Sequence, residues 1–75
     1  MSDTAERVKR IITEVACLPE PPDDDTPLMD VPGDDLDRIE MLFEIEDAFD
    51  IEISDDQAEG FLTVRDVIAF VEART

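Results

Sequence analysis

The chain has 75 residues, 22 of them acidic and 6 basic, with no histidine and one cysteine. Its net charge of -16 argues against nucleic acid as a partner, because binding to phosphate backbones relies on Lys and Arg. One cysteine rules out a disulfide within the chain, and no apolar run is long enough to span a membrane. We therefore expect one domain over residues 1–75, without membrane insertion, that is cytoplasmic and, because of its strong like charge, monomeric.

The first predicted helix begins at Asp3 or Thr4 and ends before Pro19. Proline has no backbone N–H to donate, so it and the prolines that follow stop the helix. Cys17 lies near the end of the apolar stripe of this helix, where a small buried hydrophobe is a better reading than a reactive thiol. The stripe repeats at helical spacing and consists of Val8, Ile11, Ile12, Val15 and Leu18.

A long loop rich in Pro and Asp follows, over residues 20–33. Loops of this length without secondary structure are uncommon in compact domains unless they are functional or disordered. Three apolar side chains interrupt the polar sequence of the loop and are expected to attach it to the core. They are Leu28, Met29 and Val31.

The second helix is predicted from Asp34 or Asp35 to about Phe49. Asp34 is a good N-cap residue, and Asp37 three residues later can complete a capping box. Most polar residues fall on the other faces of the helix. One buried apolar stripe is expected, made of Leu36, Ile39, Leu42, Phe43, Ile45 and Phe49.

Isoleucines alternate with charged residues over residues 50–53, a pattern that also occurs in strands. So few residues between two helices are too short for a sheet, and we expect a loop in which both isoleucines contact the core. Ser54 or Asp55 then caps a short helix that ends at Glu59, before Gly60.

The last predicted helix follows Thr63, which can form a capping box with Asp66. Its apolar residues recur at helical spacing and are Val64, Val67, Ile68 and Val71. The predicted fold class is therefore all-α, a small four-helix bundle with three long helices, one short helix and a long first loop.

The many carboxylates do not single out a catalytic or metal site. General acid–base catalysis needs carboxylates in a shaped, partly dry site, and a chain of this size has little room for one. Loops that start at Asp23 or Asp50 lack the glycine and the glutamate that an EF-hand requires. We expect no enzymatic activity, no catalytic residue and no metal site.

Residues 33–53 read GDDLDRIEMLFEIEDAFDIEI and strongly resemble the second helix and following loop of acyl carrier proteins. The resemblance covers nearly the whole chain, with ERVKRII at residues 6–12 and TVRDVIAFVE at residues 63–72. It implies an acyl-carrier-like bundle, in agreement with the helices expected from the apolar pattern.

In acyl carrier proteins the serine of an Asp-Ser-Leu motif carries a 4'-phosphopantetheine arm, whose thiol holds the acyl cargo. This sequence has Asp34, Asp35 and Leu36 at the matching positions. Asp35 offers no hydroxyl, so the resemblance implies the arm only if residue 35 were serine, and we expect no cofactor. Asp35 is then an ordinary acid favoured by the helix dipole, or a permanent charge that mimics the phosphodiester.

In this family the acidic second helix docks on basic patches of partner enzymes, and the bundle interior sequesters the acyl chain. The resemblance thus implies two kinds of partner, the basic surfaces of carrier-dependent enzymes and an acyl chain. The alternative is that the acids only solvate the bundle. The implied docking residues are Asp37, Glu40, Glu46, Asp47, Asp55 and Glu59.

Three functions remain open from the sequence. The first is a divergent acyl-carrier-like protein that docks on enzymes of lipid or secondary-metabolite synthesis and cannot be phosphopantetheinylated at residue 35. The second is a genuine acyl or aminoacyl carrier whose attachment serine is replaced by Asp35. The third is a helical bundle that binds lipid without a covalent bond.

Overall fold

The computed structural model describes residues 3–33 and 35–75, and it describes the backbone but not the side chain of Asp35. The described residues contain four α-helices and no strand, which confirms the predicted all-α bundle. No helix within these ranges is both long and apolar enough to cross a membrane. The elements in chain order are α1 (Asp3–Ala16), the 3-10 helix η1 (Leu28–Asp30), α2 (Asp35–Phe49), α3 (Asp55–Glu59) and α4 (Val64–Glu72).

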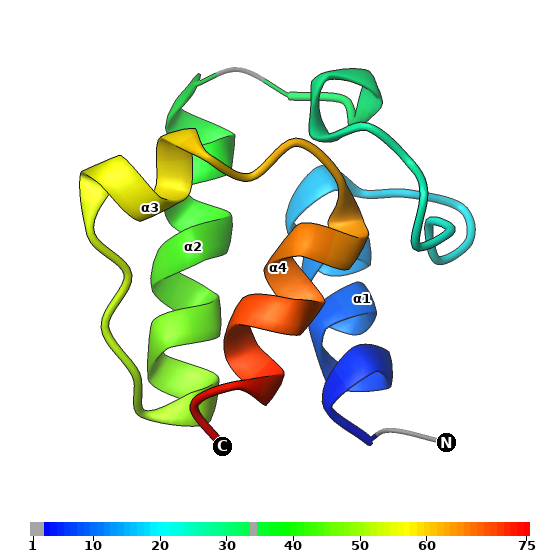
Figure 1. Cartoon of the computed structure of the whole chain (residues 1–75). Helices are drawn as coiled ribbons and strands as arrows, with labels where there is room; N and C mark the ends of the chain where they lie inside the picture. The colour runs from blue at the N-terminus through cyan, green and yellow to red at the C-terminus, as the bar shows by residue number, and fades with distance from the viewer. Residues whose placement is uncertain (1–2, 34) are drawn as a thin grey trace.

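Helix α1 packs against both α2 and α4 (Figure 1). Helix α1 begins and α4 ends at one end of the bundle, whereas α2 begins at the opposite end (Figure 1). The four apolar residues predicted for α4 are all buried, because its single apolar face is turned to the core. The buried core consists of Val8, Ile12, Leu28, Met41, Ile45, Val64, Val67, Ile68 and Val71.

The predicted buried stripe of α2 is wrong for half of its members. Leu36, Ile39 and Phe43 are 73%, 49% and 61% exposed, whereas Ile45 is fully buried. Met41, absent from the prediction, is also buried. Leu36 and Ile45 lie about two and a half turns apart and therefore on opposite sides of the helix. The apolar surface of α2 is wider than the part of the helix that contacts the rest of the bundle, so some of its apolar residues remain exposed.

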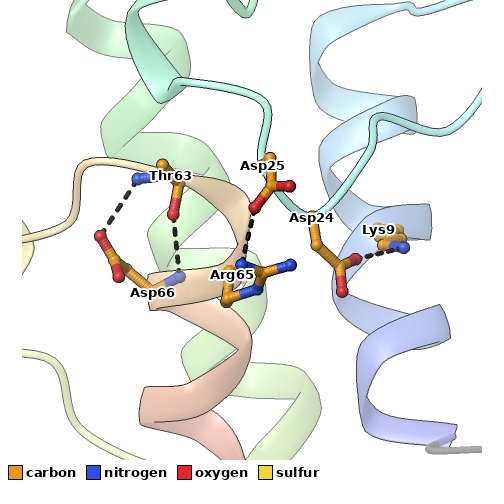
Figure 2. A network of polar contacts seen from close by, with 6 residues as sticks. All are labelled: Lys9, Asp24, Asp25, Thr63, Arg65 and Asp66. Carbon is orange, nitrogen blue, oxygen red and sulfur yellow. Dashed lines mark hydrogen bonds and ion pairs between the residues drawn. The ribbon is translucent and has the colours of Figure 1, made fainter.

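The first loop is tied to α1 and α4 by two ion pairs (Figure 2). Lys9 Nζ lies 2.5 Å from Asp24 Oδ1, and Arg65 Nη1 lies 2.7 Å from Asp25 Oδ1. The backbone N–H of Arg65 also donates to the Asp24 carbonyl at 2.7 Å. The hydrogen bond from Lys9 lowers the pKa of the Asp24 carboxyl below its ordinary value of 3.8, so this carboxylate is charged at neutral pH. The loop therefore joins the two helices at neutral pH.

The three apolar residues of the first loop differ in how deeply they are buried. Leu28 is buried and its N–H donates to the Leu62 carbonyl at 2.9 Å, while Val31 is half-buried against the core. These two contacts confirm the prediction. Met29 is 85% exposed, so its predicted contact with the core is wrong. The short helix η1 turns Met29 away from the interior while Leu28 points inward.

Cys17 ends α1 in the left-handed conformation, with φ of 54°. The Leu18 N–H donates to the Thr13 carbonyl at 2.9 Å and the Cys17 N–H to the Glu14 carbonyl at 3.4 Å, which is the pattern of a Schellman motif. Glycine is the usual residue at this position, because it adopts a positive φ without steric cost. Cys17 is exposed, and the prediction of a buried residue is wrong because the helix ends one residue before it.

Replacing Cys17 by glycine is expected to raise the free energy of unfolding by about 0.5 to 1 kcal/mol. The left-handed conformation costs a residue with a Cβ about 1 to 2 kcal/mol, and part of that gain is lost to the greater freedom of glycine in the unfolded chain. Urea denaturation followed by circular dichroism measures the change. Cys17→Ala is the control, since it keeps the Cβ and removes only the thiol. Equal stability of the Gly and Ala variants would contradict the prediction.

Candidate functional site

An exposed row of apolar side chains runs along the outward face of α2. It consists of Leu36, Ile39 and Phe43, which we call the α2 stripe, and all three side chains are exposed. Residues spaced by three and four positions are neighbours on a helix surface, so the row is continuous. Exposed apolar patches with a polar border mark interaction sites in soluble proteins. The α2 stripe is therefore the candidate site of this chain.

Carboxylates border the α2 stripe. Glu40 follows Leu36 by one turn and Asp47 follows Phe43 by one turn, so both acids lie beside the stripe, and both are exposed. The single basic residue of α2, Arg38, is turned to the first loop, where its guanidinium donates to the Leu28 carbonyl at 3.3 Å. The surface around the stripe is thus acidic, and a complementary partner presents cations around an apolar centre.

Two of the predicted docking acids have contacts within the chain. Glu46 is half-buried, and its Oε2 accepts a hydrogen bond from the Ile53 N–H at 3.0 Å. Asp37 is half-buried beside Gly33, where an added Cβ would lie 2.8 Å from Asp37 Oδ2. Gly33 also has a φ of 130°, a backbone conformation in which any other residue would be strained. Glu46 thus fixes the loop that follows α2, a role that the sequence pattern did not reveal.

The remaining predicted docking acids, Asp55 and Glu59, are exposed and lie one turn apart on the same face of α3. The Ser54 hydroxyl caps α3 by accepting a hydrogen bond from the Gln57 N–H at 3.2 Å, and Gln57 Oε1 accepts one from the Ser54 N–H at 3.0 Å. Helix α3 begins two residues after Ile53, the residue bonded to Glu46 of α2. That hydrogen bond attaches the loop before α3 to the side chain of Glu46 on α2.

Residue 35 is the first residue of α2, at the end where the helix dipole favours negative charge. The predicted N-cap Asp34 and the side chain of Asp35 lie outside the described residues. The chemistry of residue 35 does not fit a phosphopantetheine arm, because a phosphodiester to the protein requires a hydroxyl. A carboxylate in its place would form a mixed anhydride, which is prone to hydrolysis.

The hollow nearest the start of α2 is small. It has a volume of about 20 Å³, which is room for about one water molecule. Apolar side chains of α1, the first loop and α2 line it, among them Val15, Leu28, Val31 and Met41. An acyl chain does not fit into this hollow unless the helices move apart.

Comparison with known proteins identifies one family model and relatives that carry one common name. The family model for the phosphopantetheine attachment site matches residues 6–71. An acyl carrier protein of Phenylobacterium zucineum (strain HLK1) is 41% identical over 76 residues, which cover 99% of this chain and 96% of that protein. An acyl carrier protein of Prochlorococcus marinus (strain MIT 9515) is 49% identical over 45 residues, which cover 60% of this chain and 56% of that protein. The family match includes the whole of α2.

Proposed function

Because the chain belongs to the acyl carrier protein family, we propose that it acts by docking on carrier-dependent enzymes without taking up an arm at residue 35. Members of this family are carriers rather than enzymes, and phosphopantetheine is the group that the family attaches. The proposed partners are basic surfaces of enzymes in cytoplasmic lipid or secondary-metabolite synthesis. The proposed docking residues are the α2 stripe and the acids Asp37, Glu40, Glu46, Asp47, Asp55 and Glu59.

The α2 stripe carries this proposal. Protein interfaces have an apolar centre that excludes water and a polar rim that remains accessible. Leu36, Ile39 and Phe43 supply such a centre, and Glu40 and Asp47 supply part of the rim. Burial of the stripe contributes about 25 cal/mol for each Å² of apolar surface removed from water, before the loss of freedom on association is subtracted. The rim acids favour partners with Arg and Lys and disfavour acidic ones.

The net charge of -16 supports the same kind of partner. Charge of one sign raises the rate at which oppositely charged proteins meet, and dissolved salt screens this effect over about 10 Å at 0.1 M. Docking of this chain should therefore weaken as ionic strength rises.

Asp35 supports docking without an arm. The carboxylate supplies one negative charge at the N-terminus of α2, where a modified serine would carry the one charge of its phosphodiester. We propose that a partner meets this charge permanently, independent of any transferase. Noncovalent lipid binding has less support, because the hollow near this end measures only about 20 Å³.

Reversal of the two exposed rim charges tests the docking proposal. The double variant Glu40→Lys and Asp47→Lys should bind a broad-specificity phosphopantetheinyl transferase about tenfold or more weakly at low salt, because repulsion replaces attraction at the rim of the stripe. Surface plasmon resonance at two salt concentrations measures the change.

The matched control for this experiment is Glu14→Lys with Glu20→Lys, which makes the same change in net charge. Both residues are exposed and lie outside α2 and α3. At the higher salt concentration, about 0.15 M, we expect this control to bind within about twofold of the unaltered chain, since charges more than about 8 Å from the interface are then largely screened. An equal loss in both double variants would assign the effect to net charge and contradict a docking face on α2.

A further inference from the structure

An open groove lies at the C-terminal part of α2. It is lined by two apolar side chains, Phe43 and Ile51, and by three acids, Glu46, Asp47 and Asp50. We infer that this groove receives an arginine side chain of the partner, with the guanidinium stacked on the Phe43 ring and bonded to carboxylates. The inference rests on the proposed docking function and names the residue type that the α2 face selects.

The Phe43 ring is available for such a contact. The other three phenylalanines have a cation or a second ring against them. Arg7 lies over the Phe49 ring with its Cζ 4.4 Å from the centroid, and the Phe61 and Phe70 rings meet edge to face at 5.3 Å. Within residues 3–33 and 36–75, Phe43 has neither kind of partner, and it is 61% exposed. A partner can therefore cover this ring.

The carboxylates of the groove are not equally available. Glu46 already accepts the hydrogen bond from Ile53, whereas the carboxylates of Asp47 and Asp50 make no hydrogen bond or ion pair to any other described side chain or backbone group. Asp50 holds a fixed place, because the helix ends there with the Ile51 N–H donating to the Glu46 carbonyl at 3.1 Å. Asp47 and Asp50 are thus the acids that a bound cation would meet.

The end of α2 adds to the negative potential of the groove. The last turn of α2 contains no basic residue, and the helix dipole places partial negative charge on its final carbonyls. Arg7 donates to the Ala48 carbonyl at 2.9 Å while it covers Phe49, and neither Arg7 nor Phe49 lines the groove. That internal contact is an example of the arrangement inferred for the groove, an arginine that stacks on a phenylalanine and bonds to oxygen at the end of α2.

Arginine fits these features better than lysine does. A guanidinium is planar, stacks on an aromatic face and donates several hydrogen bonds in one plane, so it can contact the ring and two carboxylates together. An ammonium is a compact, strongly hydrated charge that gains less from the ring. The groove should therefore discriminate between the two residues even though their charges are equal.

The test uses two synthetic amphipathic helical peptides that are identical except that every arginine of one is lysine in the other. Fluorescence anisotropy at one fixed ionic strength gives both dissociation constants. We expect the unaltered chain to prefer the arginine peptide, and Phe43→Leu to lower this preference by about two- to fivefold, the contribution of an exposed cation–π contact. The lysine peptide should bind both proteins with nearly equal affinity.

Two further variants control the experiment. Leu36→Ala removes apolar surface at the other end of the stripe. It should weaken the binding of both peptides without changing the ratio of their dissociation constants. Asp50→Asn keeps the shape of the side chain and tolerates the φ of 53° at this position. It should weaken binding of the arginine peptide more than binding of the lysine peptide. Circular dichroism confirms that each variant is folded.

The outcomes separate this inference from the docking function. An unchanged ratio in Phe43→Leu, with both peptides still bound, would overturn the arginine site and leave docking in place. If neither peptide binds the unaltered chain, both proposals fail. A lower ratio in Phe43→Leu together with an unchanged ratio in Leu36→Ala is the result that supports the site.

Discussion

Incubation with coenzyme A, magnesium and a broad-specificity phosphopantetheinyl transferase is expected to leave the mass of the unaltered chain unchanged and to add one arm to Asp35→Ser. The transferase needs a hydroxyl oxygen to attack the pyrophosphate of coenzyme A, and Asp35 has none. Ser54 is no substitute, because its hydroxyl caps α3. Intact-mass spectrometry of both proteins side by side gives an all-or-none result.

Asp35→Asn is the control for charge. It removes the negative charge without adding a hydroxyl, so it should stay unmodified like the parent chain. Addition of the arm to the unaltered chain would contradict the proposal directly. If the serine variant also stays unmodified, the surface that the transferase recognises has diverged too, which favours a separate docking role. A serine codon at position 35 of the encoding gene would instead favour the genuine carrier.

The second large effect is expected for Ile45→Ala, which should lower the free energy of unfolding by about 2 to 5 kcal/mol. Ile45 is fully buried in the core, and removal of its side chain leaves a cavity that the surroundings fill only in part. A domain of this length is stable by only about 4 to 11 kcal/mol, so the variant loses a large share of its stability. Urea denaturation followed by circular dichroism measures the loss.

Phe43→Ala is the matched control on the same helix. Phe43 is 61% exposed, and its replacement should change the free energy of unfolding by less than about 1 kcal/mol although more atoms are removed. The same variant should weaken partner binding, because it removes apolar surface from the α2 stripe. If Phe43→Ala destabilised the fold as strongly as Ile45→Ala, the assignment of the two faces of α2 would be wrong.

The starts of α3 and α4 could be read from the sequence because local interactions set them. The predicted capping box of Thr63 and Asp66 is present at the start of α4, with the Asp66 N–H donating to Thr63 Oγ1 at 3.3 Å (Figure 2). Ser54 caps α3 as one of the two residues expected there. These contacts join residues three positions apart, so the chain needs no tertiary structure to specify them.

The candidate site was predicted less completely than the fold. The resemblance indicated six acids on α2 and α3 and also residue 35. The six acids, whose side chains the structure describes, lie on the expected helices. It did not reveal the exposed α2 stripe or the hydrogen bond from Ile53 to Glu46. This hydrogen bond joins a residue of α2 to a residue of the following loop, and no local sequence pattern predicts it.

Four helices, the caps of α3 and α4 and the buried face of α4 were predictable from local sequence, because short-range hydrogen bonds and a single apolar face leave one solution. Which side of α2 is buried depends on its packing against the other elements. The apolar residues of α2 are spread around much of the helix. Helical spacing alone is therefore compatible with burial of either Phe43 or Ile45. Packing against α1 and the first loop covers the side with Met41 and Ile45 and leaves Leu36, Ile39 and Phe43 on the surface.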